Sequence, residues 1–446
     1  MDKFLEIYKV MSKAKNVNKK HLNLEDKWEK RLQGTLFHRL QEEHKRKLQT
    51  LYNKYAFTHQ ELRKIIEVMI DFQMWDEGDY FEFWSRCEDE MDLSKRENKS
   101  RALKKLDEYI SGIKSKETEY YKVPELPVEY KRTKVERLSE YDEKDKIMGL
   151  CPVASKKTVC CNLQTLDAVK NCGFGCSYCA IQTMFTGDSV YFDKNFKSKL
   201  EKIEFDRSRL YHVGTGQSSD ALMWGDSNGI LEDLFGFARK WPNVLLEFKT
   251  KSRNVNYLVK SEVPKNIFCT WTINPNSVIQ NEEHLTASFE DRVGAARKLA
   301  DKGIRVGFHF HPMVYFKGWK EEYQGVIEKI TSIFTPEEVA FVSFGTLTFP
   351  RPIIKKIRNY NIKSKILQMP MVSNPEGKLT YPDEIKEQLF CWGYRCFSSW
   401  HKNVFFYLCM EEEKFWRSTF GEVFSSNEVF EETLLKSVSE KMGVKV

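Results

Sequence analysis

The sequence predicts an α/β fold, a partial (β/α)6 barrel of the TIM type, with a helical region before it and an extension after it. From about residue 160, short apolar or β-branched runs alternate with helical patterns. Such alternation produces a parallel sheet with right-handed crossover connections. Six units of this kind are too few for a closed eightfold barrel, so an open, partial barrel is expected.

The chain divides into four predicted regions. Residues 1–118 are charged and helical in pattern, as in 27–55, where apolar side chains recur at helical spacings, and we expect an accessory domain there. Residues 119–150 contain Pro124 and Pro127 among many charges and are expected to be a linker. Residues 151–350 hold the predicted barrel core, and residues 351–446 are expected to pack on that core as a C-terminal extension.

The predicted strands and helices of the core follow one another in strict order. Strands are expected near 163–169, 209–215, 244–250, 267–273, 304–310 and 340–346. Helices are expected near 191–203, 229–240, 253–260, 288–302 and 319–333. In one unit, Ser288 and Asp291 form a capping signal and Gly303 ends the helix before a strand. In a parallel barrel, ligand-binding groups follow the carboxyl ends of the strands.

Composition narrows the class of protein. The chain has 446 residues, of which 41% are hydrophobic and 30% are charged. No apolar run reaches the ~18 residues of a membrane span, and the start does not resemble a signal peptide, so we expect a cytoplasmic protein with no membrane partner. The net charge of +7 permits a polyanionic partner, and an ordinary solvated surface explains it equally well.

The eleven cysteines are better explained as thiols and ligands than as disulfides. Cys172, Cys176 and Cys179 are spaced C-x3-C-x2-C on a glycine-bearing loop after the first predicted strand. Three thiolates on such a loop can hold a four-iron, four-sulfur (4Fe-4S) cluster and leave one iron without a protein ligand. A zinc site or buried free thiols are the alternatives, but zinc usually takes four protein ligands in paired spacings.

Several further motifs resemble those of one family. They are CGFGCSYC (172–179), HVGTGQSSD (212–220), EFKTKSRNV (247–255), the segment 270–312, GWKEEY (318–323) and FYLCMEEEKFW (406–416). Between about 160 and 350 the chain thereby resembles spore photoproduct lyase and its homologues in the radical S-adenosylmethionine (SAM) superfamily. The resemblance implies a lyase-like enzyme in which SAM chelates the open iron. Reductive cleavage of SAM would then give a 5′-deoxyadenosyl radical.

The resemblance also implies residue roles. Cys172, Cys176 and Cys179 would be the metal ligands. The expected cofactor-binding residues are Gly214, Thr215 and Gly216 at the methionyl group, Lys251 at the carboxylate, Thr272 at the ribose, and Asn274, which like Asp220 is a polar loop position. Lys251 could instead be an ordinary solvated surface lysine, and Thr272 could be present only because threonine favours strands. His309 and His311 alternate on the fifth predicted strand, so both side chains should share one face and look toward the substrate.

Two positions depart from the family pattern. Repair enzymes of the family use a cysteine to return hydrogen to a thymine radical, and Gln217 occupies that place here. Tyr178 is present beside the third cluster cysteine, whereas its partner position is Ala180. Tyr178, Gln217 and the two histidines are therefore the catalytic candidates. Cys391, Cys396 or Cys409 could supply the missing thiol, although buried thiols in an aromatic-rich segment explain them as well.

Three functions stay open. The first is repair of a thymine-dimer lesion in DNA, with a basic stretch (Arg351, Lys355, Lys356, Arg358) that either touches phosphate or is a solvated helix face. The second is radical SAM chemistry on a modified nucleoside, peptide or metabolite. The third is a non-catalytic iron–sulfur protein that senses redox state or binds nucleic acid. Either enzyme would need a reduced electron donor of the flavodoxin or ferredoxin type.

Overall fold

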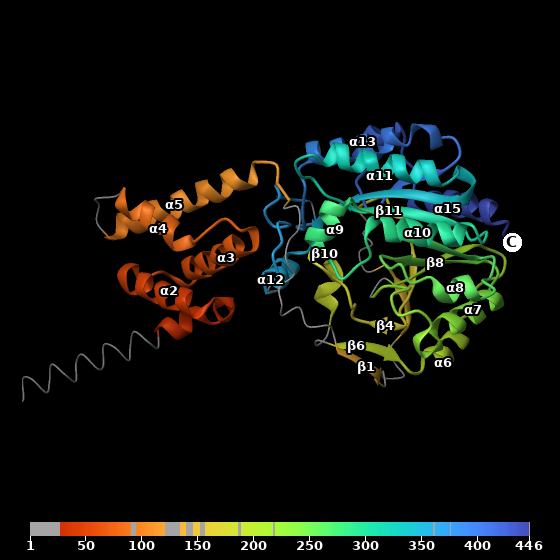
Figure 1. The fold of residues 1–446 in the computed structure, drawn as a ribbon, viewed down its shortest axis with the longest axis horizontal. Coiled ribbons are helices and arrows are strands. Elements are labelled where there is room, and N and C mark those ends of the chain that lie inside the picture. The colour runs from red at the N-terminus through yellow and green to blue at the C-terminus, as the bar shows by residue number, and fades with distance from the viewer. Residues whose placement is uncertain are drawn as a thin grey trace, which may run out of the picture. The chain divides into compact units, whose positions relative to one another are not determined.

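The computed structural model forms two compact units (Figure 1). The first comprises the described residues up to Lys114 together with Arg358–Lys363, and the second comprises the rest. The residues that the structure describes are 27–90, 95–120, 134–139, 146–151, 157–185, 189–216, 219–359, 362–374 and 376–445.

The first unit is helical in its described part. Its elements are η1 (Phe37–Arg39), α2 (Glu42–Tyr55), α3 (His59–Trp75), α4 (Tyr80–Asp89) and α5 (Lys95–Lys114). Helix α3 begins at a capping box in which Thr58 and Glu61 satisfy each other's backbone N–H groups. The helical pattern of residues 27–55 is interrupted at Gly34, whose φ of +77° is a left-handed conformation.

A segment from late in the chain completes this unit. Arg358 forms ion pairs with Asp71 at 2.8 Å and Glu67 at 2.6 Å. Asp71 is buried, and its burial raises the pKa of its carboxyl while Arg358 opposes that rise. The guanidinium of Arg358 is thus engaged within the first unit, which argues against the predicted phosphate contact at this residue.

The second unit is built on an eight-stranded sheet, with the strand order β16-β12-β11-β9-β8-β7-β3-β2. Six neighbouring strands are parallel, and they carry the predicted alternation: β3 (Gln164–Leu166), β7 (Tyr211–Thr215), β8 (Val244–Thr250), β9 (Ile267–Thr272), β11 (Val306–Met313) and β12 (Val339–Thr346). The C-terminal extension adds a parallel edge strand, β16 (Phe405–Leu408), and β2 (Met148–Leu150) is antiparallel at the other edge. The predicted partial (β/α)6 barrel is confirmed.

Helices cover the outer face of this sheet (Figure 1). They are α7 (Ile230–Lys240), α8 (Asn256–Lys260), α10 (Phe289–Ala300) and α11 (Trp319–Ile333), joined by α13 (Asp383–Cys396), α14 (Glu413–Phe420) and α15 (Asn427–Met442) from the extension. Two further helices are short, α6 (Phe196–Glu201) and α9 (Asn276–Glu282), and α12 (Arg351–Asn359) follows β12. The apolar stripe of α10 is buried against β9 and β11, as amphipathic helices on a sheet require.

One predicted helix is partly wrong. In the segment 191–203, residues up to Asp193 belong to strand β6 (Ser189–Asp193) instead of a helix. This strand pairs with β1 (Lys134–Ser139) and β4 (Val169–Lys170) in a small separate sheet. Val190, Tyr191 and Phe192 are residue types that favour strands, and four of the five positions of β6 are buried, so propensity and packing both support the strand. In the region predicted as a linker, the described residues form β1 and β2.

A short segment joins the two edges of the large sheet. Residues 157–163 precede β3, which lies beside the edge strand β2, and the backbone of Val159 pairs with that of Glu411, just after β16 at the other edge. The N–H of Cys160 also donates to Asn427 at the start of α15, at 2.9 Å. These contacts form a seam that connects the first and the last strands of the barrel.

Smaller sheets complete the unit. β5 (Gly175–Cys176) pairs with β10 (Glu283–His284), and β15 (Leu379–Thr380) pairs with both β13 (Thr348–Phe349) and β14 (Val372–Ser373). Within the described residues, no helix combines the length and apolar character that a bilayer crossing requires.

Candidate functional site

The three cysteines of the C-x3-C-x2-C motif lie on one loop after β4. The loop is held by β10, because Cys176 pairs with Glu283 across the β5–β10 ladder. The N–H of the next residue, Ser177, donates to the carbonyl of Glu282 at 2.8 Å. The loop therefore has a fixed backbone, as a ligand loop requires.

Close packing explains a glycine in this loop. A Cβ on Gly173 would lie 2.6 Å from the side chain of Met223 and 3.0 Å from the ring of Trp224. A larger residue would force one of these side chains or the loop itself to move. The loop backbone at Gly173 thus lies directly against the side chains of Met223 and Trp224.

The thiols share one electrostatic environment. Burial raises the pKa of Cys172 to about 12, and burial also raises the pKa values of Cys176 and Cys179. Cys176 interacts electrostatically with both other thiols, and Lys251 lowers the pKa of all three. A metal is needed to hold such enclosed thiols as thiolates.

The chemistry of the donor set fits a 4Fe-4S cluster, because such clusters are held by cysteine thiolates. Among the described residues, no group of three or more His, Cys, Asp or Glu side chains is placed to hold a metal ion. Cys172, Cys176 and Cys179 would hold the cluster.

Lys251 brings a positive charge to the thiols. It directly follows β8, and its ammonium nitrogen lies 5.8 Å from the centroid of the Tyr178 ring. Burial alone would lower the pKa of Lys251, but Cys176 and Glu283 raise it overall, so the side chain is charged at neutral pH. A fixed ammonium beside the open side of a cluster can bind a carboxylate.

Asp220 fixes the backbone from which Lys251 projects. One carboxylate oxygen accepts the N–H of Lys251 at 2.7 Å, and the other accepts the hydroxyl of Thr250, also at 2.7 Å. Asp220 also accepts backbone N–H groups of the turn after β7. The buried carboxylate of Asp220 thus links the turn after β7 to the end of β8, and both of its oxygens accept hydrogen bonds.

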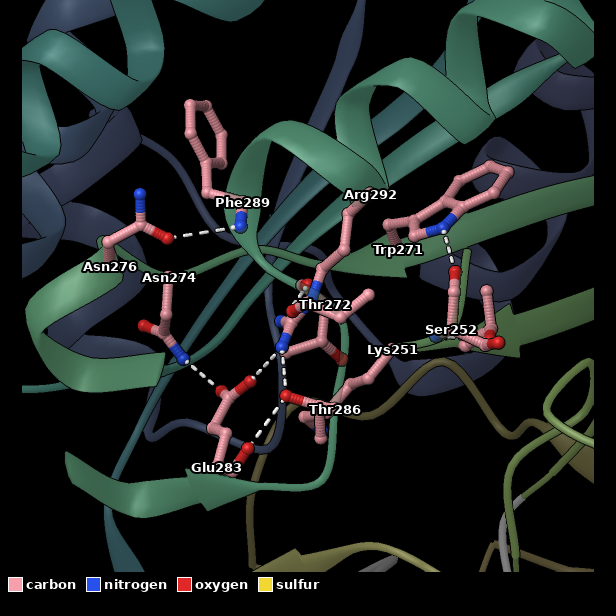
Figure 2. A network of polar contacts seen from close by, with 12 residues as sticks. Lys251, Ser252, Trp271, Thr272, Asn274, Asn276, Glu283, Thr286, Phe289 and Arg292 are labelled. Atoms are coloured by element: carbon pink, nitrogen blue, oxygen red, sulfur yellow. Dashed lines mark hydrogen bonds and ion pairs between the residues drawn. The ribbon is translucent and has the colours of Figure 1, made fainter. Parts of the chain in front are cut away.

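Glu283 is the centre of a buried network (Figure 2). Its carboxylate accepts hydrogen bonds from the hydroxyl of Tyr178, the amide of Asn274 at 2.8 Å and the guanidinium of Arg292. Arg292 also donates to the carbonyl of Thr272 at 2.8 Å. Burial alone would raise the pKa of Glu283, but Arg292 and Lys251 lower it overall, so the carboxylate is ionised.

Three of the predicted site residues contact Glu283 or Arg292 in this network. Tyr178 is buried with its hydroxyl on Glu283. Asn274 is engaged at both polar ends, since its oxygen accepts the hydroxyl of Tyr323 at 2.7 Å. Thr272 is buried at the end of β9. The described contacts assign positioning work to Tyr178 and Asn274.

The glycine-bearing strand end after β7 lies close to β8. Gly216 has a φ of +88°, and a Cβ there would lie 2.7 Å from the backbone nitrogen of Ala221 and 2.9 Å from the carbonyl oxygen of Lys249. Thr215 is buried and donates to the carbonyl of Glu247 at 3.4 Å. The predicted catalytic candidate Gln217 lies outside the described residues.

The two histidines belong to a chain of polar groups inside the barrel. Nε2 of His309 lies 2.7 Å from Glu247, and its Nδ1 lies 2.6 Å from the hydroxyl of Ser343. That hydroxyl lies 3.1 Å from Nε2 of His311, and His212 contacts the second oxygen of Glu247 at 2.8 Å. Burial lowers the pKa of His309 to about 4, so its imidazole is neutral at pH 7.

Sequence reasoning missed Glu283, Arg292 and Glu247. Arg292 is fully buried on a helix whose other buried positions are apolar or small, and a charge in such a stripe is the signal that could have found it. Glu283 belongs to a two-residue strand that local sequence does not predict. Glu247, inside an otherwise apolar strand, is a comparable signal.

The sequence comparisons agree on one family. A sequence model of the family described as spore photoproduct lyase matches residues 165–371. The spore photoproduct lyase of Clostridium acetobutylicum is 25% identical over 230 residues, which cover 50% of this chain and 64% of the relative. The enzyme of the same name from Bacillus subtilis is 28% identical over 123 residues, or 27% of this chain and 36% of the relative. The chain thus spans less than two thirds of the curated relatives that it matches.

Solved structures give a similar result. A spore photoproduct lyase complexed with dinucleoside spore photoproduct aligns with a TM-score of 0.47 at 20% identity, over 54% of this chain and 74% of that one. A mutant form with bound AdoMet and the same dinucleoside also aligns with a TM-score of 0.47, over 55% and 75% of the two chains. The resemblance predicted from the motifs is confirmed by the sequence comparisons: residues 165–371, which carry the three-thiol loop and the parallel strands behind it, match the spore photoproduct lyase family.

Proposed function

We propose that this chain is a radical SAM enzyme of the spore photoproduct lyase type, which acts on a thymine-dimer lesion in DNA. The observation that carries the proposal is the set of three buried thiols on one loop, which pairing with β10 holds in place, beside the ammonium of Lys251. When bound, a 4Fe-4S cluster and SAM supply reductive cleavage of the sulfonium to a 5′-deoxyadenosyl radical.

The chain's own groups would position these cofactors. Cys172, Cys176 and Cys179 hold the cluster as thiolates. Lys251 neutralises the carboxylate of SAM, and Asp220 fixes the strand end from which Lys251 projects. The tight approach of Gly216 to the β8 backbone keeps the methionyl side of the site narrow.

The lesion is the part of the proposal that depends most on the relatives. Spore photoproduct lyases of two bacteria match this chain by sequence, and one similar solved structure is a spore photoproduct lyase complexed with dinucleoside spore photoproduct. A flavodoxin or ferredoxin would supply the electron. The helical unit is proposed to be an accessory domain that contacts DNA or a partner, because it lies outside the family match.

The first experiment tests the cofactor chemistry. We expect anaerobic reconstitution to give about four irons and four sulfides per chain and SAM-dependent 5′-deoxyadenosine after reduction with dithionite. Replacing Cys176 with Ala should abolish the brown chromophore and the nucleoside. Cys396 is a thiol on α13, and Cys396→Ala is the matched control that should keep both the chromophore and the nucleoside. Full cluster and full SAM cleavage in Cys176→Ala would refute the ligand assignment.

A second experiment tests the substrate. The reduced holoenzyme is incubated with dinucleoside spore photoproduct, and the release of thymine monomers is measured by mass spectrometry. Repair supports the lesion assignment. SAM cleavage without repair of this probe would instead favour a modified nucleoside, peptide or metabolite, as the Gln217 and Ala180 substitutions suggest.

A further inference from the structure

The inside of the barrel is arranged in layers. Side chains alternate along a strand, so positions two residues apart face the same side. The hydrogen bonds around Glu247 define one inner layer, which is almost closed to solvent, with Glu247 1% and His309 3% exposed. This layer consists of His212, Glu247, Thr270, His309 and Ser343.

Two residues farther along each strand lies the next layer toward the carboxyl ends. It consists of Gly214, Lys249, Thr272, His311, Gly345 and, after β16, Cys409. Contacts confirm the grouping: Lys249 interacts electrostatically with both His311 and Cys409, and a Cβ on Gly345 would lie 3.0 Å from the His311 ring. Lys249, His311 and Cys409 each keep part of their surface accessible, as side chains near the open end should.

One layer farther out is the cofactor site. Lys251 stands two residues beyond Lys249 and interacts with all three thiols of the C-x3-C-x2-C loop. Two residues of strand span roughly 7 Å. Cys409, which interacts with Lys249, therefore belongs to the layer next to that of Lys251.

Cys409 also belongs to a cluster of thiols at the seam of the barrel. Cys409 interacts electrostatically with Cys151 and Cys160, and Cys161 interacts with Cys409 and hydrogen bonds to Cys160. The backbone sets this arrangement: the N–H of Cys409 donates to Phe344 of β12 at 2.8 Å, and that of Cys151 donates to Leu163 at 2.9 Å. We call Cys151, Cys160, Cys161 and Cys409 the seam thiols.

The protonation state of Cys409 suits hydrogen transfer. Burial raises its pKa to about 12, and the charge on Lys249 only partly opposes this rise. At neutral pH the side chain is a neutral thiol with its S–H bond intact. A thiolate would be a nucleophile or a metal ligand, but it would have no hydrogen to give.

We propose that Cys409 is the hydrogen-atom donor of this barrel, a role that rests on the proposed radical SAM function. A carbon radical on the substrate takes the hydrogen of Cys409: the S–H bond breaks homolytically, a C–H bond forms, and the unpaired electron stays on sulfur. The sulfur regains a hydrogen atom from 5′-deoxyadenosine, the nucleoside that the proposed reaction supplies: a 5′ C–H bond breaks, the S–H bond re-forms, and the 5′-deoxyadenosyl radical that results rejoins methionine as SAM and returns its electron to the cluster. No outside oxidant or reductant is required.

The other thiols of the C-terminal extension are placed differently. Cys391 and Cys396 both lie on α13, one of the helices outside the sheet. Cys391 donates to the carbonyl of Ser418 on α14, and Cys396 interacts with Arg395 and with Glu328 of α11. Neither belongs to the inner layers, so both serve as controls.

The test follows hydrogen through Cys409. Holoenzyme equilibrated in D2O carries an S–D group at this residue. Without substrate, reduction should give 5′-deoxyadenosine that has gained deuterium from S–D. In Cys409→Ser and Cys409→Ala that deuterium should fall at least fivefold while the iron content stays unchanged, and Cys396→Ser should behave as the parent chain. With dinucleoside spore photoproduct, the same Cys409 variants should lose deuterium in the thymine product.

A second measurement does not depend on activity. The full-length protein is treated anaerobically with diamide, which removes two hydrogens from a pair of thiols, and its peptides are mapped. Cys409 should be recovered in a disulfide with another seam thiol. Unchanged deuterium transfer in both Cys409 variants, or recovery of Cys409 only as a free thiol after diamide, would overturn the proposal. About eight irons per chain, lowered to four by Cys409→Ala, would also overturn it, because the seam thiols would then hold a second cluster. Absence of any 5′-deoxyadenosine would instead remove the proposed function itself.

Discussion

At the scale of single residues, the site depends on charges that are buried in pairs. Arg292 and Glu283 are 0% and 1% exposed, and each is the main compensation for the other. Lys251 adds a second positive charge and makes the carboxylate of Glu283 more acidic. The ion pair holds Tyr178 and Asn274 in place, although neither charge belongs to a recognisable motif.

Replacing Arg292 with Met should therefore be costly. Removing Arg292 leaves a buried carboxylate without its main positive partner, with only Lys251 in part compensating its charge, and the free energy of unfolding should fall by about 3–5 kcal/mol. The double variant Arg292→Met with Glu283→Gln removes both charges and should recover at least half of that loss. Urea unfolding of the single and double variants measures the difference. Equal losses in both would show that the pair contributes packing and not charge compensation.

Among the secondary-structure elements, helix α9 and strand β10 hold the cysteine loop through backbone hydrogen bonds to Cys176 and Ser177. Glu282 at the end of α9 is fully buried and accepts hydrogen bonds from Ser364 at 2.6 Å and the N–H of Lys365 at 2.9 Å, as well as from Ser177. Burial raises the pKa of its carboxyl to about 7. The carboxyl is thus close to half protonated in a neutral solution.

Stability should depend on pH through Glu282. The folded state keeps a proton that the unfolded chain releases near pH 4.5, so this group's contribution is complete below pH 4.5 and is lost as pH rises through 7. The free energy of unfolding should fall by about 3 kcal/mol over that range. Glu282→Gln copies the protonated acid and should flatten the slope. An unchanged slope in urea unfolding at pH 5, 6, 7 and 8 would contradict this assignment.

Long elements were predictable from sequence, and short ones were not. Strand β8 and helix α11 lie where the sequence predicted them, because β8 is a nearly continuous apolar run and α11 repeats its apolar spacing over several turns. Strand β5 and its partner β10 are two residues long and exist only through pairing with each other. The three-cysteine motif was visible as spacing. In contrast, Glu283 meets Arg292, and Glu247 meets His212 and His309, only after folding.

In the whole molecule, two separate segments of the chain form the first, helical unit. Residues Arg358–Lys363 leave the second unit and complete the helical unit before the chain returns to the barrel. Arg358 is the main contribution of that segment, through its ion pairs with Asp71 and Glu67. The helical unit therefore depends for its stability on residues that a simple N-terminal fragment would lack.

Arg358→Ala should destabilise the helical unit selectively. It leaves the buried Asp71 without its partner, and breaking such a pair costs about 3 kcal/mol or more. Differential scanning calorimetry should show the transition of the helical unit moving to lower temperature while that of the barrel stays in place. Lys363→Ala is the control, since its pair with Asp76 is exposed and should matter little. A shift of the barrel transition alone would contradict the assignment.

The seam between Val159 and Glu411 has a consequence for biosynthesis. More than half of the polypeptide separates these residues, and a ribosome must translate all of it before they can pair. The cysteine loop is translated before Glu411, so it leaves the ribosome before this seam can form. We expect the proposed cluster to be inserted only after β16 has been translated, and nascent chains shortened before β16 should not retain iron.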